Sequence, residues 1–508
     1  MLQVAGSSIS WNWRMGAPRD HARASPGAAR VVAPKPLAVM RYVQYFLSVA
    51  GARFAAMLLS AATFPFLVRV IGVEGFGRWS YVLAVVGFFD LVVNPGLVAY
   101  ASREVAVHRT GANVLVSEVF TLRAALGVAG ALLLTAYALG VESDRATQGL
   151  LLVYGVPFLL VGALQSSYLL TSSECFHWAS MQQVVAQGAY AIAVFALIRT
   201  DADLVALALI SLGSLALSTA LGWIKLAELG YRLRWTWAPT RFFELLRQSL
   251  PLGAAALASQ VYTRSGHVIV RWALGETALG LYAAVVRLAE VIFSFVGIFF
   301  GLLMPRMALS SSHDEKRRKL AQHGFVLAWT VSVPLAVGGS VLAPDLAASV
   351  LGPGYEAGGR LFRVVSFYFL TNSLATFFAG TLLYALGLRH QYLLATTAGA
   401  IFGISVNALL IPLMGISIAC ISYVCSQLVV AAVASKLAPS DLSGLWRGRL
   451  VATPVVGSFV MAATLVGLGG GGMNVWLEVA LGAVIYASVI LAVARRELAT
   501  ILRRKASS

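Results

Sequence analysis

Long apolar runs separated by short polar connections fill the chain from about residue 43 to residue 494. Most runs are about 20 residues long and lack strict alternation, which favours membrane-spanning helices over strands. Inside a bilayer, every backbone polar group needs an internal partner, and helices provide one. The fourteen expected segments lie at 43–71, 77–101, 115–139, 147–170, 178–199, 203–225, 248–273, 278–304, 321–343, 361–386, 391–413, 416–436, 450–468 and 475–494. The pattern predicts an all-α polytopic membrane protein.

Composition excludes an ordinary soluble fold. Of the 508 residues, 59% are hydrophobic and 12% are charged, whereas soluble proteins carry about 25% charged residues. The three cysteines, Cys175, Cys420 and Cys425, give no disulfide framework and are interpreted as small buried side chains.

The positions of the basic residues predict an orientation. With the amino terminus in the cytoplasm, most of the 38 Lys and Arg residues fall in cytoplasmic segments, and most loop acids fall outside. We therefore expect a multi-pass protein of the bacterial cytoplasmic (inner) membrane with both termini inside. The net charge of +17 then serves topology and attraction to anionic lipid, and no nucleic-acid partner is expected.

Two glycine-containing joints, six spans apart, predict an internal repeat. They share an arginine before the glycines and a tyrosine after them: Arg69, Gly72, Gly77 and Tyr81 in the first joint, and Arg271, Gly275, Gly280 and Tyr282 in the second. An even number of intervening spans makes the halves parallel, with a path between them.

The repeat and the charge pattern give the domain organisation. The expected parts are a basic, disordered cytoplasmic tail (1–42), an N-terminal six-helix bundle (43–225), a cytoplasmic linker (226–247), a C-terminal six-helix bundle (248–436), two additional helices (450–494) and a basic cytoplasmic tail (495–508).

Charges at membrane depth are the first candidate site residues. Arg53, Arg264 and Arg287 sit deep in their spans, where a charge costs about 2.5–3.5 kcal/mol unless it faces water or a partner. Glu290 stands at ion-pair spacing from Arg287, so a local salt bridge and a cavity role both remain open. Arg53 has no acid at that spacing, nor has Arg264, and both are expected to line a cationic cavity.

Other intramembrane polar residues leave more than one interpretation. Snorkelling to the interface accounts for Arg69, Arg123, Arg271 and Arg363. Coupling to a proton or sodium gradient is a hypothesis for Asp90, His267 and Glu290, against structural pairing with neighbouring helices.

Several stretches resemble a known transporter family. "FLVRVIGVEGFGRWSYVLAVVGFFDLVVNPGL" with "SREVAVHR" resembles the first two spans of oligosaccharide (O-antigen, Wzx-type) flippases. The "LGPGYEAG" turn, the span ending "ALG" and the N-x3-IP-x2-G pattern that begins at Asn407 are similar to their later half. The resemblance covers roughly residues 43–440 and carries no catalytic signature.

The resemblance implies both a fold and a function. The family belongs to the multidrug/oligosaccharidyl-lipid/polysaccharide (MOP) exporter superfamily, with two pseudo-symmetric six-helix bundles in a V and two further carboxy-terminal helices. Its members move undecaprenyl-pyrophosphate-linked oligosaccharides to the outer leaflet for O-antigen or exopolysaccharide synthesis. The expected partners are this lipid-linked cargo, membrane lipids, and the polysaccharide polymerase and chain-length machinery. No cofactor is expected beyond gradient coupling.

The candidate residues suit such a cargo. Guanidinium groups donate paired hydrogen bonds to phosphate and stay ionised. Hydrogen bonds to sugars, or pairing between helices, are the alternatives for Gln183, Gln187, Asn372 and Asn407.

Other functions remain in competition. A cation-coupled multidrug exporter of the same fold would favour acidic residues, whereas the deep charges here lean positive. A lipid II flippase differs in cargo. A membrane polymerase or ligase needs a sizeable outer loop and catalytic groups, and the sequence shows no such loop, catalytic constellation or metal motif. The "GLGGGG" run at 467–472 is an outer turn, since it lacks the context of a nucleotide-binding loop.

Overall fold

A computed structural model describes residues 36–107, 112–309, 314–439, 448–468 and 474–506. Residues 1–46 and 47–508 form separate units, and the second contains nearly all of the described helical residues. Most of the expected amino-terminal tail, the end of the carboxy-terminal tail and most of the "GLGGGG" run lie outside the described residues.

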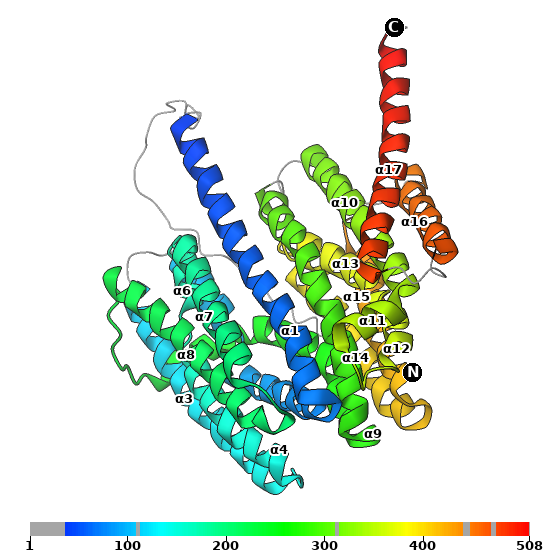
Figure 1. Ribbon diagram of the computed structural model, residues 1–508. Helices are drawn as coiled ribbons and strands as arrows, with labels where there is room; N and C mark the ends of the chain where they lie inside the picture. Colours follow the sequence, from blue (N-terminus) through cyan, green and yellow to red (C-terminus); the bar gives the residue numbers. More distant parts are fainter. Residues whose placement is uncertain (1–35, 108–111, 310–313, 440–447, 469–473, 507–508) are drawn as a thin grey trace, which may run out of the picture. The chain divides into compact units, whose positions relative to one another are not determined.

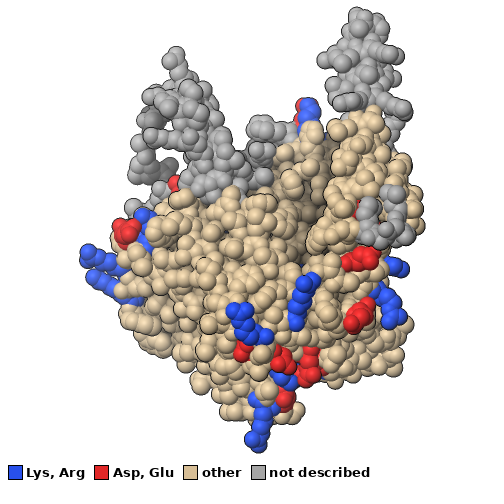
Figure 2. Space-filling view, in the orientation of Figure 1, with Lys and Arg blue, Asp and Glu red and all other residues tan. Residues whose placement is uncertain are grey.

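The described regular structure is entirely helical, which confirms the all-α class. Within it, eleven stretches are long and apolar enough to cross a membrane, and Val451–Gly467 is a shorter apolar helix. On the face that Figure 2 shows, most of the surface is uncharged, and acidic and basic side chains gather mainly toward its lower end. A lipid-exposed surface has this character.

Among the described residues, the first half is built from ten helical elements that pack against one another in pairs. Its elements are α1 (Pro36–Val93), α2 (Leu97–Val107), α3 (Ala112–Gly140), α4 (Arg145–Leu150), η1 (Leu151–Gly155), α5 (Val156–Ala163), α6 (Ser167–Ser172), α7 (Phe176–Leu197), η2 (Asp201–Asp203) and α8 (Leu204–Glu228). Helix α7 packs against α8, as can be followed in Figure 1. Helix α3 packs against α5, and α2 against α6.

The second half begins with α9 and is followed by two more helices. Its elements are α9 (Pro239–Leu309), α10 (Asp314–Val341), α11 (Ala343–Leu351), α12 (Gly358–Val365), α13 (Tyr368–Ala375), η3 (Thr376–Leu383), α14 (Arg389–Met414) and α15 (Ile416–Leu437). Helix α14 packs against α9 and α15. The additional α16 (Gly448–Leu468) packs against α10 and α17 (Val475–Ala506).

The two longest helices are each broken at a repeat glycine. Helix α1 leaves helical geometry at Gly72 (φ 69°, ψ 178°), and α9 does so at Gly275 (φ 87°, ψ −178°). Positive φ is easily adopted only by glycine. Their apolar stretches of 40 and 46 residues therefore each hold two consecutive helices, although the count of fourteen stays a prediction.

The two joints touch reciprocally. A Cβ atom on Gly77 would overlap the carbonyl oxygen of Glu276, and one on Gly280 would overlap that of Val73. Val73 and Glu276 each follow the broken glycine of their own joint. An exchange of equivalent contacts is the signature of a two-fold relation, so the sequence repeat is also a structural one.

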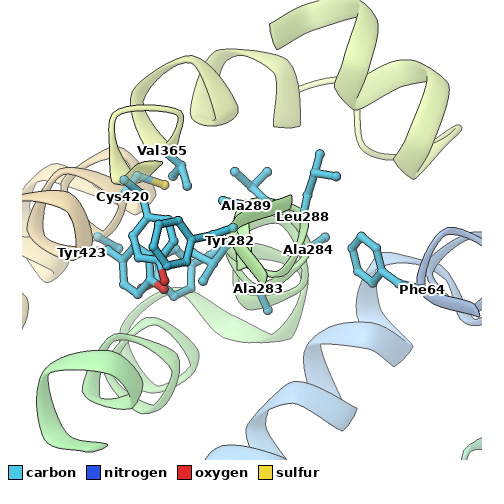
Figure 3. Packing of buried hydrophobic residues seen from close by; sticks show 14 of the residues in the cluster. Phe64, Tyr282, Ala283, Ala284, Leu288, Ala289, Val365, Cys420 and Tyr423 are labelled. Carbon is cyan, nitrogen blue, oxygen red and sulfur yellow. The ribbon is translucent and has the colours of Figure 1, made fainter. Parts of the chain in front are cut away.

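The helix after Gly275 lies in the middle of the packed core. Figure 3 shows Ala283 and Ala284 on this helix, with Phe64 of α1 to one side and Cys420 and Tyr423 of α15 to the other. Small residues let helices approach closely where lipid supplies no hydrophobic drive. This packing fixes the helix from which much of the candidate site is built.

Candidate functional site

A polar cavity of about 480 Å³ lies between the two halves. A second hollow of about 430 Å³ continues it, because both are lined by Ser60, Gln187, Arg287 and Glu290. These volumes are in the usual range for small-molecule sites.

The lining comes mainly from four helical segments with one spacing. Each segment beside a glycine joint contributes residues at i, i+3, i+4 and i+7, which share one helix face. These are Ser60, Thr63, Phe64 and Leu67; Phe76, Trp79, Ser80 and Leu83; Gln260, Thr263, Arg264 and His267; and Ala283, Val286, Arg287 and Glu290. Tyr154, Gln187, Tyr190, Ser211 and Ser214 add polar and aromatic groups from η1, α7 and α8.

Arg264 reaches from the second half to the first across this cavity. Its Nε donates to Gln260 Oε1 at 3.0 Å, and its Nη1 approaches the Leu83 carbonyl oxygen at 3.4 Å. Gly87 leaves room for the guanidinium, since a Cβ there would lie 3.4 Å from Nε. Arg264 makes no salt bridge with any described residue, so its charge is available to a ligand.

Arg287 and Glu290 form the local pair that their spacing allows. Arg287 Nη1 lies 3.2 Å from Glu290 Oε2, and the Tyr423 hydroxyl donates to Glu290 Oε1 at 3.3 Å. Half of the Arg287 side chain is exposed, and both charged groups line the cavity. The pair therefore combines the two alternatives, a local salt bridge and a cavity position.

The structure brings three more candidates to the cavity walls. His267 lines it, with its ring edge-on to Tyr282 at 5.1 Å between centroids. Its Nδ1 is buried without a hydrogen-bond partner among the described residues. Gln187 lines both hollows and Gln183 the second one.

Three candidates lie away from the described cavity lining, and the side chain of a fourth is outside the described residues. Asn407 is buried and donates to Ser265 Oγ at 3.2 Å, a helix-to-helix bond, and neither it nor Asn372 is among the described lining residues. Asp90 is half-buried beside Gly162 and within electrostatic range of Arg123 and Arg264. The side chain of Arg53 lies outside the described part of α1. The roles proposed for all of these residues stay predictions.

Snorkelling was the wrong explanation for two arginines. Arg123 is only 4% exposed and donates to the carbonyl oxygens of Gly162 and Gln165 at 2.8 and 3.0 Å. Arg271 is bonded to Glu142 by two hydrogen bonds of 3.0 and 3.1 Å, and its guanidinium lies 4.1 Å from the centre of the Tyr81 ring. Both side chains therefore bond to groups within the protein and do not extend to the membrane surface.

An ion-pair network closes the cavity at the end where the glycine joints lie, here called the joint end. Glu276 of the second half pairs with Arg271 at 3.1 Å and with Arg78 of the first half at 2.9 Å. Glu142, also of the first half, pairs with Arg271. Arg69 donates to the carbonyl oxygens of Ser349 and Val350 at the end of α11. These contacts tie the two halves together.

Asp144 belongs to the same network. Burial alone would raise the pKa of its carboxyl group, but hydrogen bonds from the hydroxyl and amide of Thr147, with the Arg78 guanidinium, lower the pKa below its usual value. Asp144 also caps the first turn of α4. It is therefore an anion at neutral pH and supports the closed joint end.

The apolar helices of the described residues and the cavity between two related halves define a multi-pass membrane protein. Residues 43–311 match the model of a family described as "Polysaccharide biosynthesis protein". The match spans more than half of the chain, and the chain belongs to this family. The comparison with curated proteins gave no match.

Solved structures show the same fold at low sequence identity. A lipid II flippase MurJ in an inward closed conformation has a TM-score of 0.72 at 13% identity, over 89% of this chain and 99% of that one. An inward-facing MATE family multidrug transporter of the MOP superfamily has a TM-score of 0.60 at 13% identity, covering 78% and 96%. A MOP superfamily transporter from Pyrococcus furiosus, described with a binding pocket of reverse polarity, gives 0.55 at 14%, covering 78% and 96%. The chain therefore shares the fold of these transporters.

Proposed function

We propose that the protein is a flippase that moves undecaprenyl-pyrophosphate-linked oligosaccharide across the cytoplasmic membrane, for O-antigen or exopolysaccharide synthesis. The observation that carries this proposal is the guanidinium of Arg264, which stands in a polar cavity between the halves without an acidic partner among the described residues. Membership of the polysaccharide biosynthesis family supports a glycan cargo.

The lining suits a pyrophosphate-linked sugar. Arg264 presents a permanent positive charge with donors in a planar fork, which matches phosphate oxygens. Around it stand hydroxyl and amide groups, such as those of Ser60, Thr63 and Gln187, and the rings of Trp79 and Tyr190. A few dispersed polar groups hold a headgroup without trapping it. The polyprenyl tail remains in lipid while the headgroup passes between the halves.

The charge distribution gives the direction. As part of this proposal, the protein lies in a bacterial inner membrane, and the basic residues near 225–247 and 495–508 support a cytoplasmic location for these segments and for both termini. The joint end then faces outward, and its ion pairs keep the cavity closed on that side. Transport by alternating access requires the network to break when the outer side opens. Coupling to a proton or sodium gradient is assigned, as part of this proposal, to Asp90, His267 and Glu290.

Deletion of the gene tests the proposal directly. We expect loss of surface polymer and accumulation of carrier-linked repeat units on the inner leaflet. Normal polymer with altered dye resistance would support a multidrug exporter instead. The 0.72 TM-score with a lipid II flippase favours a second candidate cargo, and rescue of a strain depleted of its own lipid II flippase would identify it. Association with a polymerase and chain-length regulator belongs to the same proposal and is tested by co-purification.

A further inference from the structure

The connection between the two halves, residues 231–238, is an extended segment held against α3. We call it the strap. The backbone N–H of Arg234 donates to Ser117 Oγ and that of Thr236 to Thr121 Oγ1, both at 3.2 Å. The ring of Trp235 packs edge-on against Phe120, with centroids 5.5 Å apart. Alternate N–H groups of an extended chain point the same way. Side-chain oxygens of α3 therefore accept the hydrogen bonds that a neighbouring strand would accept in a sheet.

Side chains of two kinds alternate along the strap. Arg232 and Arg234 lie on one side of the extended chain, and Leu233, Trp235 and Trp237 lie on the other. Both tryptophans are 75% exposed. Both arginines are exposed, and neither forms a salt bridge with any described residue. The strap is therefore a ribbon with one cationic and one aromatic edge.

This ribbon fits neither bulk water nor hydrocarbon. In water, two large indole rings would be exposed to solvent. In the bilayer core, two guanidinium charges would lack water and an ion-pair partner, which is energetically costly. At the membrane surface, however, indole rings sit at headgroup level and guanidinium groups meet lipid phosphates. Exposed Phe243 and Arg247 continue the same combination at the start of α9.

We propose that the strap binds the headgroup layer of an anionic phospholipid membrane. Its place on the cytoplasmic leaflet rests on the proposed topology, but the contact with lipid is independent of the cargo. The strap is the covalent link between α8 and α9, so this contact anchors the connection between the halves to the bilayer surface.

Quenching of tryptophan fluorescence tests this contact. The full-length protein in phosphatidylcholine nanodiscs is titrated with brominated phosphatidylglycerol or with brominated phosphatidylcholine. The strap signal is the quenching in the wild type minus that in the Trp235→Phe/Trp237→Phe protein, and Trp476→Phe serves as the control for an exposed tryptophan elsewhere. Each basic residue near an anionic surface strengthens binding about fivefold, so with Arg232 and Arg234 we expect half-maximal quenching at a roughly 25-fold lower fraction of phosphatidylglycerol than of phosphatidylcholine.

Charge removal then identifies the source of the preference. Arg232→Gln/Arg234→Gln should abolish the preference for phosphatidylglycerol, and Arg199→Gln, which removes an exposed arginine far along the chain, should keep it. Equal quenching by both lipids in the wild type would overturn the proposal, as would no strap signal at all, which would favour a protein partner. Because the nanodiscs contain no polyprenyl lipid, failure here leaves the flippase proposal untouched.

Discussion

Gly77 and Gly280 face each other across the contact between the two halves, and neither leaves room for a side chain. A Cβ on Gly77 would overlap the Glu276 carbonyl oxygen and lie 2.9 Å from the Gly280 nitrogen. A Cβ on Gly280 would overlap the Val73 carbonyl oxygen. At the closed joint end, backbone therefore packs directly against backbone. This close approach is possible because Gly77 and Gly280 carry a hydrogen atom where other residues carry a Cβ.

Gly77→Ala or Gly280→Ala should force the joint end open. Overpacking costs about 1–3 kcal/mol, which shifts a two-state equilibrium by a factor of roughly 5 to 150. Ser80, a cavity residue close to the joint, provides the probe. In a Ser80→Cys background, labelling by an impermeant thiol reagent from the outer side should rise in both variants.

Gly75→Ala is the matched control for this experiment. A Cβ on Gly75 would meet its nearest neighbour, in Ile71, at an ordinary 3.5 Å. Labelling should therefore stay at the level of the background protein. Equal labelling of all three alanine variants would show that the glycine contact does not control the joint end.

The ion pair between Arg271 and Glu142 should contribute to the same closure. Their side chains are 10% and 5% exposed, and removing one partner of a buried pair costs about 3 kcal/mol. Glu142→Gln should lower the thermal unfolding temperature in detergent. The double variant Glu142→Gln/Arg271→Gln should be more stable than the sum of its single changes implies.

Arg145→Gln is the control for charge alone. Arg145 begins α4, next to the network, but is exposed. Its replacement should leave the free energy of unfolding within about 0.5 kcal/mol of the wild-type value, and the unfolding temperature nearly unchanged. Strict additivity of the Glu142 and Arg271 changes would mean that the pair adds nothing to the closed end.

Local sequence patterns were enough to predict the features that depend on neighbours along one helix. The apolar runs gave the helical class, the glycine joints indicated the repeat, and spacing indicated the Arg287–Glu290 pair, found at 3.2 Å. The spacing of i, i+3, i+4 and i+7 beside each joint is also readable in the sequence. It would have indicated Ser60, Thr63 and Trp79 as lining residues, which residue-by-residue reasoning missed.

Partners distant along the chain could not be predicted in this way. Glu142 and Arg271 are 129 residues apart, and Asn407 and Ser265 are 142 apart. Arg123 binds two backbone carbonyls, which have no signature in side-chain chemistry. Helix periodicity shows which side chains share one face of a helix, but the tertiary packing decides which other helix that face contacts.

Arg264→Ala should reduce export of surface polymer at least tenfold without changing protein level. The substitution removes a cavity charge that forms no salt bridge with a described acid, and hydrogen bonds to charged groups contribute about 1.5–3 kcal/mol. Arg264→Lys should retain part of the activity, because it keeps the charge but loses the planar fork. Export is measured as surface polymer per unit of membrane protein.

Arg363→Ala removes an arginine that is exposed and outside the cavity lining, so its export should match the wild type. Full export by Arg264→Ala would remove the cationic-cavity mechanism. A fall in protein level alone would indicate a structural role through Gln260 and Leu83 instead.

Asp90→Asn should uncouple transport from the ion gradient. The Asp90 carboxylate lies within electrostatic range of Arg123 and Arg264 but makes no hydrogen bond with a described residue. A carboxylate in a structural salt bridge would be hydrogen-bonded to its partner. It can therefore take up a cation without breaking a bond. In proteoliposomes, the variant should keep exchange of labelled lipid-linked substrate and lose the acceleration by a proton or sodium gradient. Asp201→Asn, at an exposed loop position, should keep both. If Asp90→Asn responds to the gradient as the wild type does, coupling must lie with Glu290 or His267, which line the cavity itself.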